Sequence, residues 1–74
     1  MGEAMNKGVR LLRRVIYDIR QAEVAARCQV SRAAVSMWAI GERKPRRRHR
    51  LRLLREFEIP LDSWDKISLP FSLP

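Results

Sequence analysis

The sequence has few of the residues that reinforce small proteins. Cys28 is its one cysteine, so the 74 residues can form neither an internal disulfide nor a cysteine-based metal cluster. A chain of this length has one small core, which is marginal unless a partner adds buried surface. We therefore expect a single domain in the reducing cytoplasm, without a metal or cofactor, that gains stability as a homodimer. Cys28 itself is expected to be a small buried hydrophobe.

Long apolar runs and catalytic constellations are also missing. The longest uncharged apolar stretch, residues 33–41, is too short to cross a bilayer, and residues 1–6 contain neither a signal segment nor a myristoylation motif. We therefore expect no contact with a membrane. Paired acids, a nucleophile beside a base and a Gly-rich phosphate loop are absent, so we do not expect an enzyme. His49 has no second ligand at metal spacing and is expected at the surface or facing a phosphate.

Positive charge is abundant and unevenly placed. The chain has a net charge of +8 and a pI near 11.3. Residues 43–55 contain eight Lys or Arg and no acid, whereas residues 56–74 have a net charge of −3. A concentrated basic segment is typical of a protein that binds a polyanion, although such a run can also serve only to keep a surface soluble.

Residues 21–40 predict two short helices joined by a tight turn. The first helix is expected over residues 21–28, with an apolar face formed by Val24, Ala25 and Cys28. Ser31 stands where the N-cap of the second helix belongs, and that helix is expected from Arg32 to about Ile40, with Gly41 just beyond its end. Its packing side carries Val35 and Trp38, and its opposite arc carries Arg32, Ala33, Ser36, Met37 and Ile40.

Three further helices are predicted around this pair. A first helix is expected from Val9 to about Asp18, with an apolar stripe of Leu12, Val15, Ile16 and Ile19. A fourth helix should have Pro45 in its first turn, a basic beginning, and an apolar side formed by Leu51, Leu53, Leu54 and Phe57. Pro60 should end it before a short fifth helix, whose Leu61 and Trp64 are expected to close the core, with Trp64 also a candidate for a dimer surface. We expect residues 1–7 to be flexible, residues 8–66 to form the domain and residues 67–74 to be an extended tail.

Six residues at fixed spacing resemble the helix-turn-helix of the Cro and lambda-repressor family, also called XRE-like: Gln21, Ala25, Val30, Ser31, Val35 and Trp38. The resemblance extends from about Val9 to Trp64. Two positions depart from the family pattern: Gln29 replaces the usual turn Gly, and Arg20 replaces the usual Thr or Ser cap. The resemblance implies an all-α, five-helix lambda-repressor-like domain, with the helix-turn-helix at helices 2 and 3 and an extended C-terminal tail. It also implies a sequence-specific double-stranded DNA-binding transcriptional regulator, a repressor rather than an activator.

Matching positions in that family assign site residues. The residues expected to read bases in the major groove are Arg32, Ala33, Ser36 and Met37. Those expected to bind phosphates are Gln21, Ser31, Arg43, Lys44, Arg46 and Arg47. Because one short helix reads few base pairs, we expect a homodimer on a pseudo-palindromic operator, associated with the nucleoid when bound. Its interface is expected to include Trp64, Ile67, Leu69 and Phe71.

Three other interpretations remain open. The chain can be an antitoxin or adaptor that binds another protein through its C-terminal tail and uses DNA binding only for autoregulation. It can instead be a nucleic-acid-binding protein without sequence preference, in which the basic segment does most of the binding. It can also be a small helical bundle in which Val35 and Trp38 are only core residues.

Overall fold

The computed structural model describes residues 5–65 and 67–68 of the chain. Its elements follow the order β1 (Met5–Asn6), α1 (Lys7–Ile19), α2 (Gln21–Cys28), α3 (Arg32–Ala39), α4 (Arg47–Phe57), the 3-10 helix η1 (Leu61–Asp65) and β2 (Ile67–Ser68). The two short strands pair antiparallel, with Met5 opposite Ser68 and Asn6 opposite Ile67. Residues 5–7 of the segment expected to be flexible therefore belong to β1 and α1.

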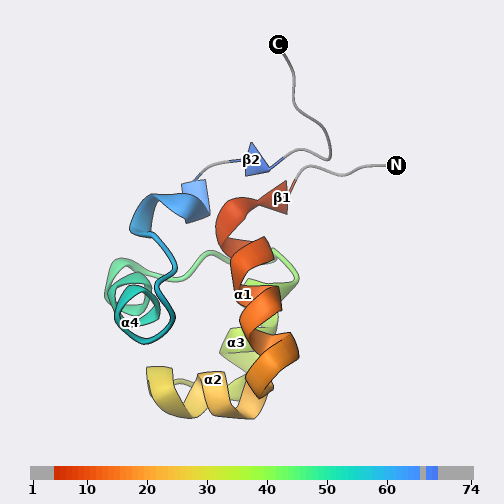
Figure 1. Cartoon of the computed structure of the whole chain (residues 1–74), viewed down its shortest axis with the longest axis vertical. Helices are drawn as coiled ribbons and strands as arrows, with labels where there is room; N and C mark the ends of the chain where they lie inside the picture. Colours follow the sequence, from red (N-terminus) through yellow and green to blue (C-terminus); the bar gives the residue numbers. More distant parts are fainter. Residues whose placement is uncertain (1–4, 66, 69–74) are drawn as a thin grey trace.

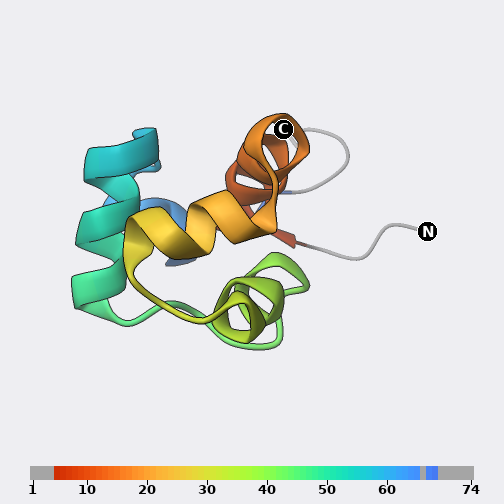
Figure 2. The same ribbon diagram turned by 90° about the horizontal axis from the view of Figure 1, so that it is seen from below.

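The helices surround one core. In Figure 1, α1 stands beside α3, and α4 lies on the other side of the molecule. Figure 2 shows α2 running between α1 and α4, with α3 on one side of it. The 3-10 helix η1 packs against both α1 and α4, so it closes the end of the core that α2 leaves open.

Local hydrogen bonds explain where α1 begins and ends. The side-chain Oδ1 of Asn6 accepts from the backbone N–H of Val9 at 2.7 Å, so the helix starts at Lys7, slightly before the predicted Val9. Arg20 takes a φ of 79°, and its N–H donates to the carbonyl of Ile16 at 2.8 Å. A residue with a positive φ cannot continue a right-handed helix, so the chain turns directly into α2.

The turn between α2 and α3 has the predicted form. Gln29 follows α2 with a φ of 59°, the left-handed conformation expected at the position where the family usually has Gly. The N–H of Val30 donates to the carbonyl of Ala25 at 3.0 Å, which closes the end of α2. Ser31 then caps α3, because its Oγ accepts from the N–H of Ala34 at 3.1 Å. The expected bounds of α2 and the start of α3 are confirmed.

The core contains the apolar residues of the two-helix motif and a few from each neighbouring element. Its buried members are Val9, Leu12, Val24, Ala25, Cys28, Val35, Trp38, Ala39, Leu53, Ile59 and Trp64. Trp64 has no exposed area within the single chain, so it has no surface to offer a second subunit. Its expected place in a dimer interface is therefore corrected, and it is a core residue. Of the other residues expected there, Ile67 pairs through its backbone in β2, and Leu69 and Phe71 lie outside the described residues.

Three predictions about the second half of the chain are wrong in detail. The fourth helix begins at Arg47, with Arg46 as N-cap, so Pro45 precedes it and is buried in the loop. Leu53 is buried, but Leu51 and Leu54 are 45% and 38% exposed. At 3.6 residues per turn one face cannot hold all of these leucines, and only the side of Leu53 meets the core. The expected fifth helix is the 3-10 helix η1, which follows Pro60.

Candidate nucleic-acid interface

The two sides of α3 differ sharply in exposure. Val35, Trp38 and Ala39 are buried against α1 and α2. Of the four residues expected to read bases, Arg32 and Ala33 are exposed, and Ser36 and Met37 are partly buried. Ile40, one turn beyond Ser36 on the same arc, is 57% exposed. An apolar side chain left this open to water at the end of a polar arc is suited to contact with another molecule.

A groove joins this arc to the basic loop that follows α3. It has a volume of about 300 Å³ and is lined by Ser31, Ala33, Ala34, Met37, Trp38, Arg43, Lys44, Arg46 and His49. Figure 2 shows α3 and the loop toward α4 on the same side of the molecule. The fold thus brings predicted base-reading residues and predicted phosphate-binding residues to one concave surface.

The backbone after α3 reverses so that the loop returns beside the helix. Gly41 has a φ of 79°, which glycine adopts without steric cost, and its N–H donates to the carbonyl of Trp38 at 3.2 Å. The N–H groups of Glu42 and Arg43 donate to the carbonyl of Met37 at 3.0 Å and 3.4 Å. This hydrogen bonding holds the first cation of the basic loop next to the exposed arc of α3.

Cations crowd the beginning of α4. The N-cap Arg46 makes no side-chain capping hydrogen bond, and the first turn contains no acidic residue. Arg46, Arg47 and Arg48 are all exposed. Positive side chains at a helix N-terminus oppose the helix dipole, so an external anion would stabilise this arrangement. Arg47 also lines a separate hollow on the other side of Arg46, next to Leu61 and Asp65.

Asp65 holds the basic loop against η1. It pairs with Arg50 Nη1 at 3.1 Å and with Lys44 Nζ at 3.4 Å, and Arg50 Nε donates to the carbonyl of Pro45 at 2.9 Å. Hydrogen bonds from Arg50 and then from Lys44 lower the pKa of Asp65 below its usual value. Lys44, expected to bind phosphate, is therefore already paired with an acid. Sequence reasoning missed this contact because Lys44 and Asp65 are separated by 21 positions.

His49 packs against Trp38 of α3. Its ring centroid lies 5.3 Å from that of Trp38 with the rings tilted by 44°. Burial, followed by the charges of Arg48 and Arg46, lowers the pKa of His49 from its usual value of 6.5. The expectation of a surface residue is revised to a half-buried one that lines the groove.

One arginine of α1 fixes the far end of α3. Arg13 Nε donates to the carbonyl of Ala39 at 2.7 Å, although the two residues are 26 positions apart. The last carbonyls of a helix have no partner inside the helix, and a cation there also meets the negative end of the dipole. Arg13 therefore positions α3. The long separation left no local signal from which to predict it.

Gln21 and Gln29 lie at the two ends of α2. Gln21 is the first residue of α2 and is partly buried. Gln29 in the turn is in contact with Arg52 of α4, whose Nη2 lies 3.4 Å from its Oε1. The turn of the motif is thus tied to α4, and its conformation does not depend on local preference alone.

Other kinds of site are not seen in the described part of the chain. No group of three or more His, Cys, Asp or Glu residues within it could hold a metal ion. None of its helices is long and apolar enough to cross a membrane.

Comparison with known proteins agrees with this geometry. No curated protein and no solved structure matches the chain. A model of the helix-turn-helix family matches residues 9–64, which include α2, α3, the basic loop, α4 and most of η1. Taken with the capped α3 and its exposed arc, this match shows that the chain belongs to the Cro and lambda-repressor, or XRE-like, helix-turn-helix family of DNA-binding transcription regulators.

Proposed function

We propose that this regulator is a repressor that binds a pseudo-palindromic operator in double-stranded DNA as a homodimer, with α3 in the major groove. The observation that supports this proposal best is the groove in which Ala33 and Met37 of α3 face Arg43 and Arg46 of the basic loop. A duplex laid against this surface meets base edges with one wall and a phosphate backbone with the other.

Arg32 is the best candidate for reading a base directly. It is the first residue of α3 and is exposed, and a guanidinium can donate to both O6 and N7 of a guanine. Ala33 and Met37 offer apolar contact to a thymine methyl group, and Ser36 can pair with a base or a phosphate. Ile40 extends this apolar surface by one turn, since it is 57% exposed on the same arc.

The phosphate contacts come from the loop and from helix N-termini. Arg43, Arg46 and Arg47 are exposed cations, and Gln21 begins α2. The hydroxyl of Ser31 accepts from Ala34 and still has its own proton to donate to a phosphate oxygen. Lys44 can join them only by sharing its ammonium group with Asp65.

Repression requires only that the bound protein blocks polymerase, whereas activation requires a contact surface for polymerase. Dimerisation follows from the limited reach of one helix. One α3 contacts only a few base pairs, so specific binding calls for two half-sites about 34 Å apart. We assign the subunit interface to the C-terminal segment that contains Ile67, Leu69 and Phe71.

Selection of sites from randomised duplex DNA at a fixed salt concentration tests the proposal. We expect an enriched inverted repeat, protected as two half-sites in footprinting. Enrichment of no sequence above random duplex would instead support binding without sequence preference. A selected site without a repeat would contradict the dimer. Deleting residues 67–74 should reduce dimerisation in light scattering and operator affinity together, and a shortened chain that still dimerises would place the interface elsewhere.

A further inference from the structure

One face of α1 carries cations and an aromatic ring that the DNA-binding surface does not use. Lys7, Arg10, Arg14 and Tyr17 follow one another at intervals of three and four residues, which places them along one side of the helix. All four are exposed, and Tyr17 is 87% exposed, more than any other large hydrophobic residue in the described chain. Arginine and tyrosine are the residue types that most often dominate protein interfaces.

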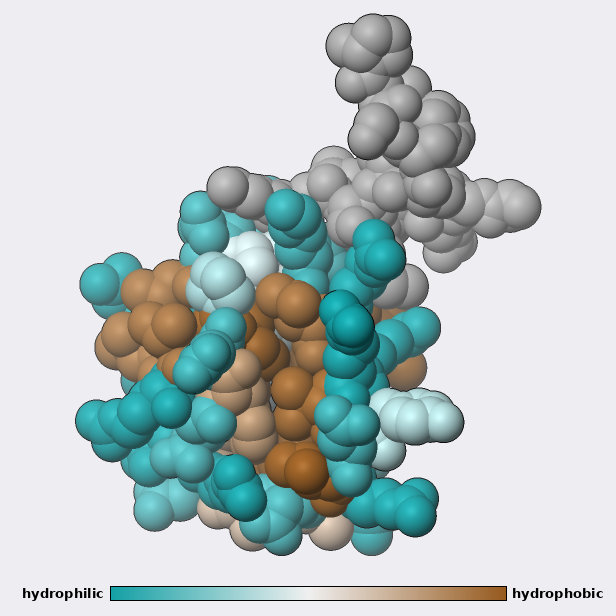
Figure 3. All heavy atoms as spheres, in the orientation of Figure 1, coloured by the Kyte–Doolittle hydropathy of each residue, from teal (hydrophilic) through white to brown (hydrophobic). Residues whose placement is uncertain are grey.

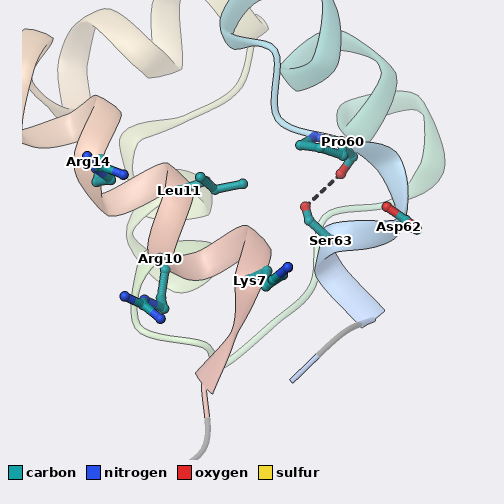
Figure 4. A pocket seen from close by; sticks show the side chains of 7 residues that line it. All are labelled: Lys7, Arg10, Leu11, Arg14, Pro60, Asp62 and Ser63. Atoms are coloured by element: carbon teal, nitrogen blue, oxygen red, sulfur yellow. Dashed lines mark hydrogen bonds between the residues drawn. The ribbon is translucent and has the colours of Figure 1, made fainter. Parts of the chain in front are cut away.

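Two hollows lie along this face, and Arg14 lines both of them. The first, of about 320 Å³, is lined by Lys7, Arg10, Leu11, Arg14, Pro60, Asp62 and Ser63. Figure 4 shows Leu11 and Lys7 reaching from α1 toward η1 across it. The second, of about 350 Å³, is lined by Arg13, Arg14, Tyr17 and Asp18.

The first hollow combines apolar and cationic walls. Leu11 and Pro60 give it apolar surface, and the positive charges of Lys7, Arg10 and Arg14 outnumber the one negative charge of Asp62. The wall on η1 is fixed, because Ser63 Oγ donates to the carbonyl of Pro60 at 2.6 Å. Figure 3 shows further apolar side chains gathered between α4 and α1 on this side of the molecule. A ligand that fits must bring both an apolar group and negative charge.

Part of this face lies off the side of α1 that meets α3. Arg13 marks that side, because it donates to Ala39. Lys7 and Arg14 are displaced from Arg13 by about a third of a turn around the helix axis, whereas Tyr17, four residues after Arg13, lies nearer to it. Figure 1 shows α3 behind α1, so a duplex against α3 leaves the near face of α1 open.

We infer that this face of α1 docks an acidic amphipathic helix of a partner protein. The stretch from Lys7 to Tyr17 rises about 15 Å along the axis, the length of roughly three helical turns. The partner places one large apolar side chain between Leu11 and Pro60 and its carboxylates beside Lys7 and Arg14. Two hollows joined through one arginine suit such an extended segment better than a compact small molecule. Since a duplex against α3 leaves the near face of α1 open, the regulator holds its partner while bound to an operator.

Peptide selection on the full chain tests this inference. Random peptides of about 12 residues, enough for three helical turns, are selected on the full chain saturated with duplex DNA. The DNA covers the basic residues of α4 and of the loop before it, so that acidic peptides do not bind there. We expect enriched peptides to be acidic, with large apolar residues at intervals of three or four. Arg14→Glu should weaken binding of an enriched peptide by about tenfold or more, and Tyr17→Ala should also weaken it.

Arg55→Glu is the matched control, because Arg55 is an exposed arginine on α4 and its reversal changes the net charge equally. It should leave peptide binding within about twofold of the unmodified chain, the range expected for a charge outside the contact. Equal losses for Arg14→Glu and Arg55→Glu, or enrichment of peptides without acids, would overturn the inference. If Arg14→Glu but not Arg55→Glu abolishes self-association, the face binds a second copy of the chain. If Arg14→Glu but not Arg55→Glu lowers operator affinity, the face binds DNA. Each of these two results would also overturn it, while the proposed operator binding is judged separately by site selection.

Discussion

Replacing Gly8 with alanine should destabilise the fold, although alanine is the better helix former. A Cβ on Gly8 would lie 2.7 Å from Cε2 of Trp64 and closer still to Cδ2 and Cε3. Trp64 is fully buried, so the rigid ring has no free space into which to move. Overpacking of this kind costs about 1–3 kcal/mol, and a direct overlap with a ring belongs at the upper end of that range. The higher helix propensity of alanine offsets about 1 kcal/mol of this cost, so the free energy of unfolding should fall by about 2 kcal/mol.

Such a loss is a large part of the stability of a 74-residue domain, which is on the order of 4–11 kcal/mol. The melting temperature should fall by roughly 8–16 °C in a thermal unfolding experiment followed by circular dichroism. Gly41→Ala separates overlap from backbone strain, because Gly41 has a φ of 79° but a Cβ added to it would meet no atom within 4 Å. It should cost only about 1 kcal/mol.

A second substitution, Trp64→Phe, tests whether the overlap with the Trp64 ring causes the loss. Among the described residues, Trp64 Nε1 is the buried side-chain polar atom without a hydrogen-bond partner, so Trp64→Phe removes an unsatisfied donor as well as part of the ring. In that background Gly8→Ala should cost clearly less than in the unmodified chain, which a double-mutant cycle measures. A Gly8→Ala chain that melts at or above the unmodified temperature would refute the argument, and so would identical costs in both backgrounds.

Three further predictions concern the DNA-binding surface. Arg32→Ala should weaken operator binding by about 1–3 kcal/mol and relax preference mainly at one guanine, whereas Arg46→Ala should weaken all sequences alike and reduce the salt slope by about 0.9. Titrations against single-base operator variants check this, and a uniform loss for Arg32→Ala would make it a phosphate contact. Arg13→Met should speed hydrogen exchange in the last turn of α3 while Arg14→Met does not, and unchanged exchange would remove Arg13 from its positioning role. The pKa of His49 is lowered from 6.5, so the unfolded chain binds a proton before the folded chain does as the pH falls. The contribution of neutral His49 to the free energy of unfolding is therefore present above pH 6.5 and is lost as the pH falls below that value. Denaturant titrations of His49→Gln should show a smaller loss between neutral and mildly acidic pH, and an equal loss would contradict the assignment.

The sequence by itself determined the motif and its local geometry. The bounds of α2, the cap at Ser31 and the left-handed turn at Gln29 depend on hydrogen bonds between residues a few positions apart. Such interactions leave a pattern in the order of residues, so they could be predicted from the apolar spacing and the family resemblance. The basic segment and the exposed arc of α3 were also predictable, because helical periodicity fixes which residues share a side.

Tertiary structure alone decided how the motif is held and which side chains remain free. Arg13 meets Ala39 across 26 positions, and Lys44 meets Asp65 across 21, so no local pattern indicates either contact. The exposure of Leu51 and Leu54 follows from where α4 meets the core, a property of helix packing and not of composition. Of the two places expected for Trp64, the core and a dimer surface, the structure gives the core, because the N-terminal turn of α1, with a glycine at its second position, lies close enough to cover the ring.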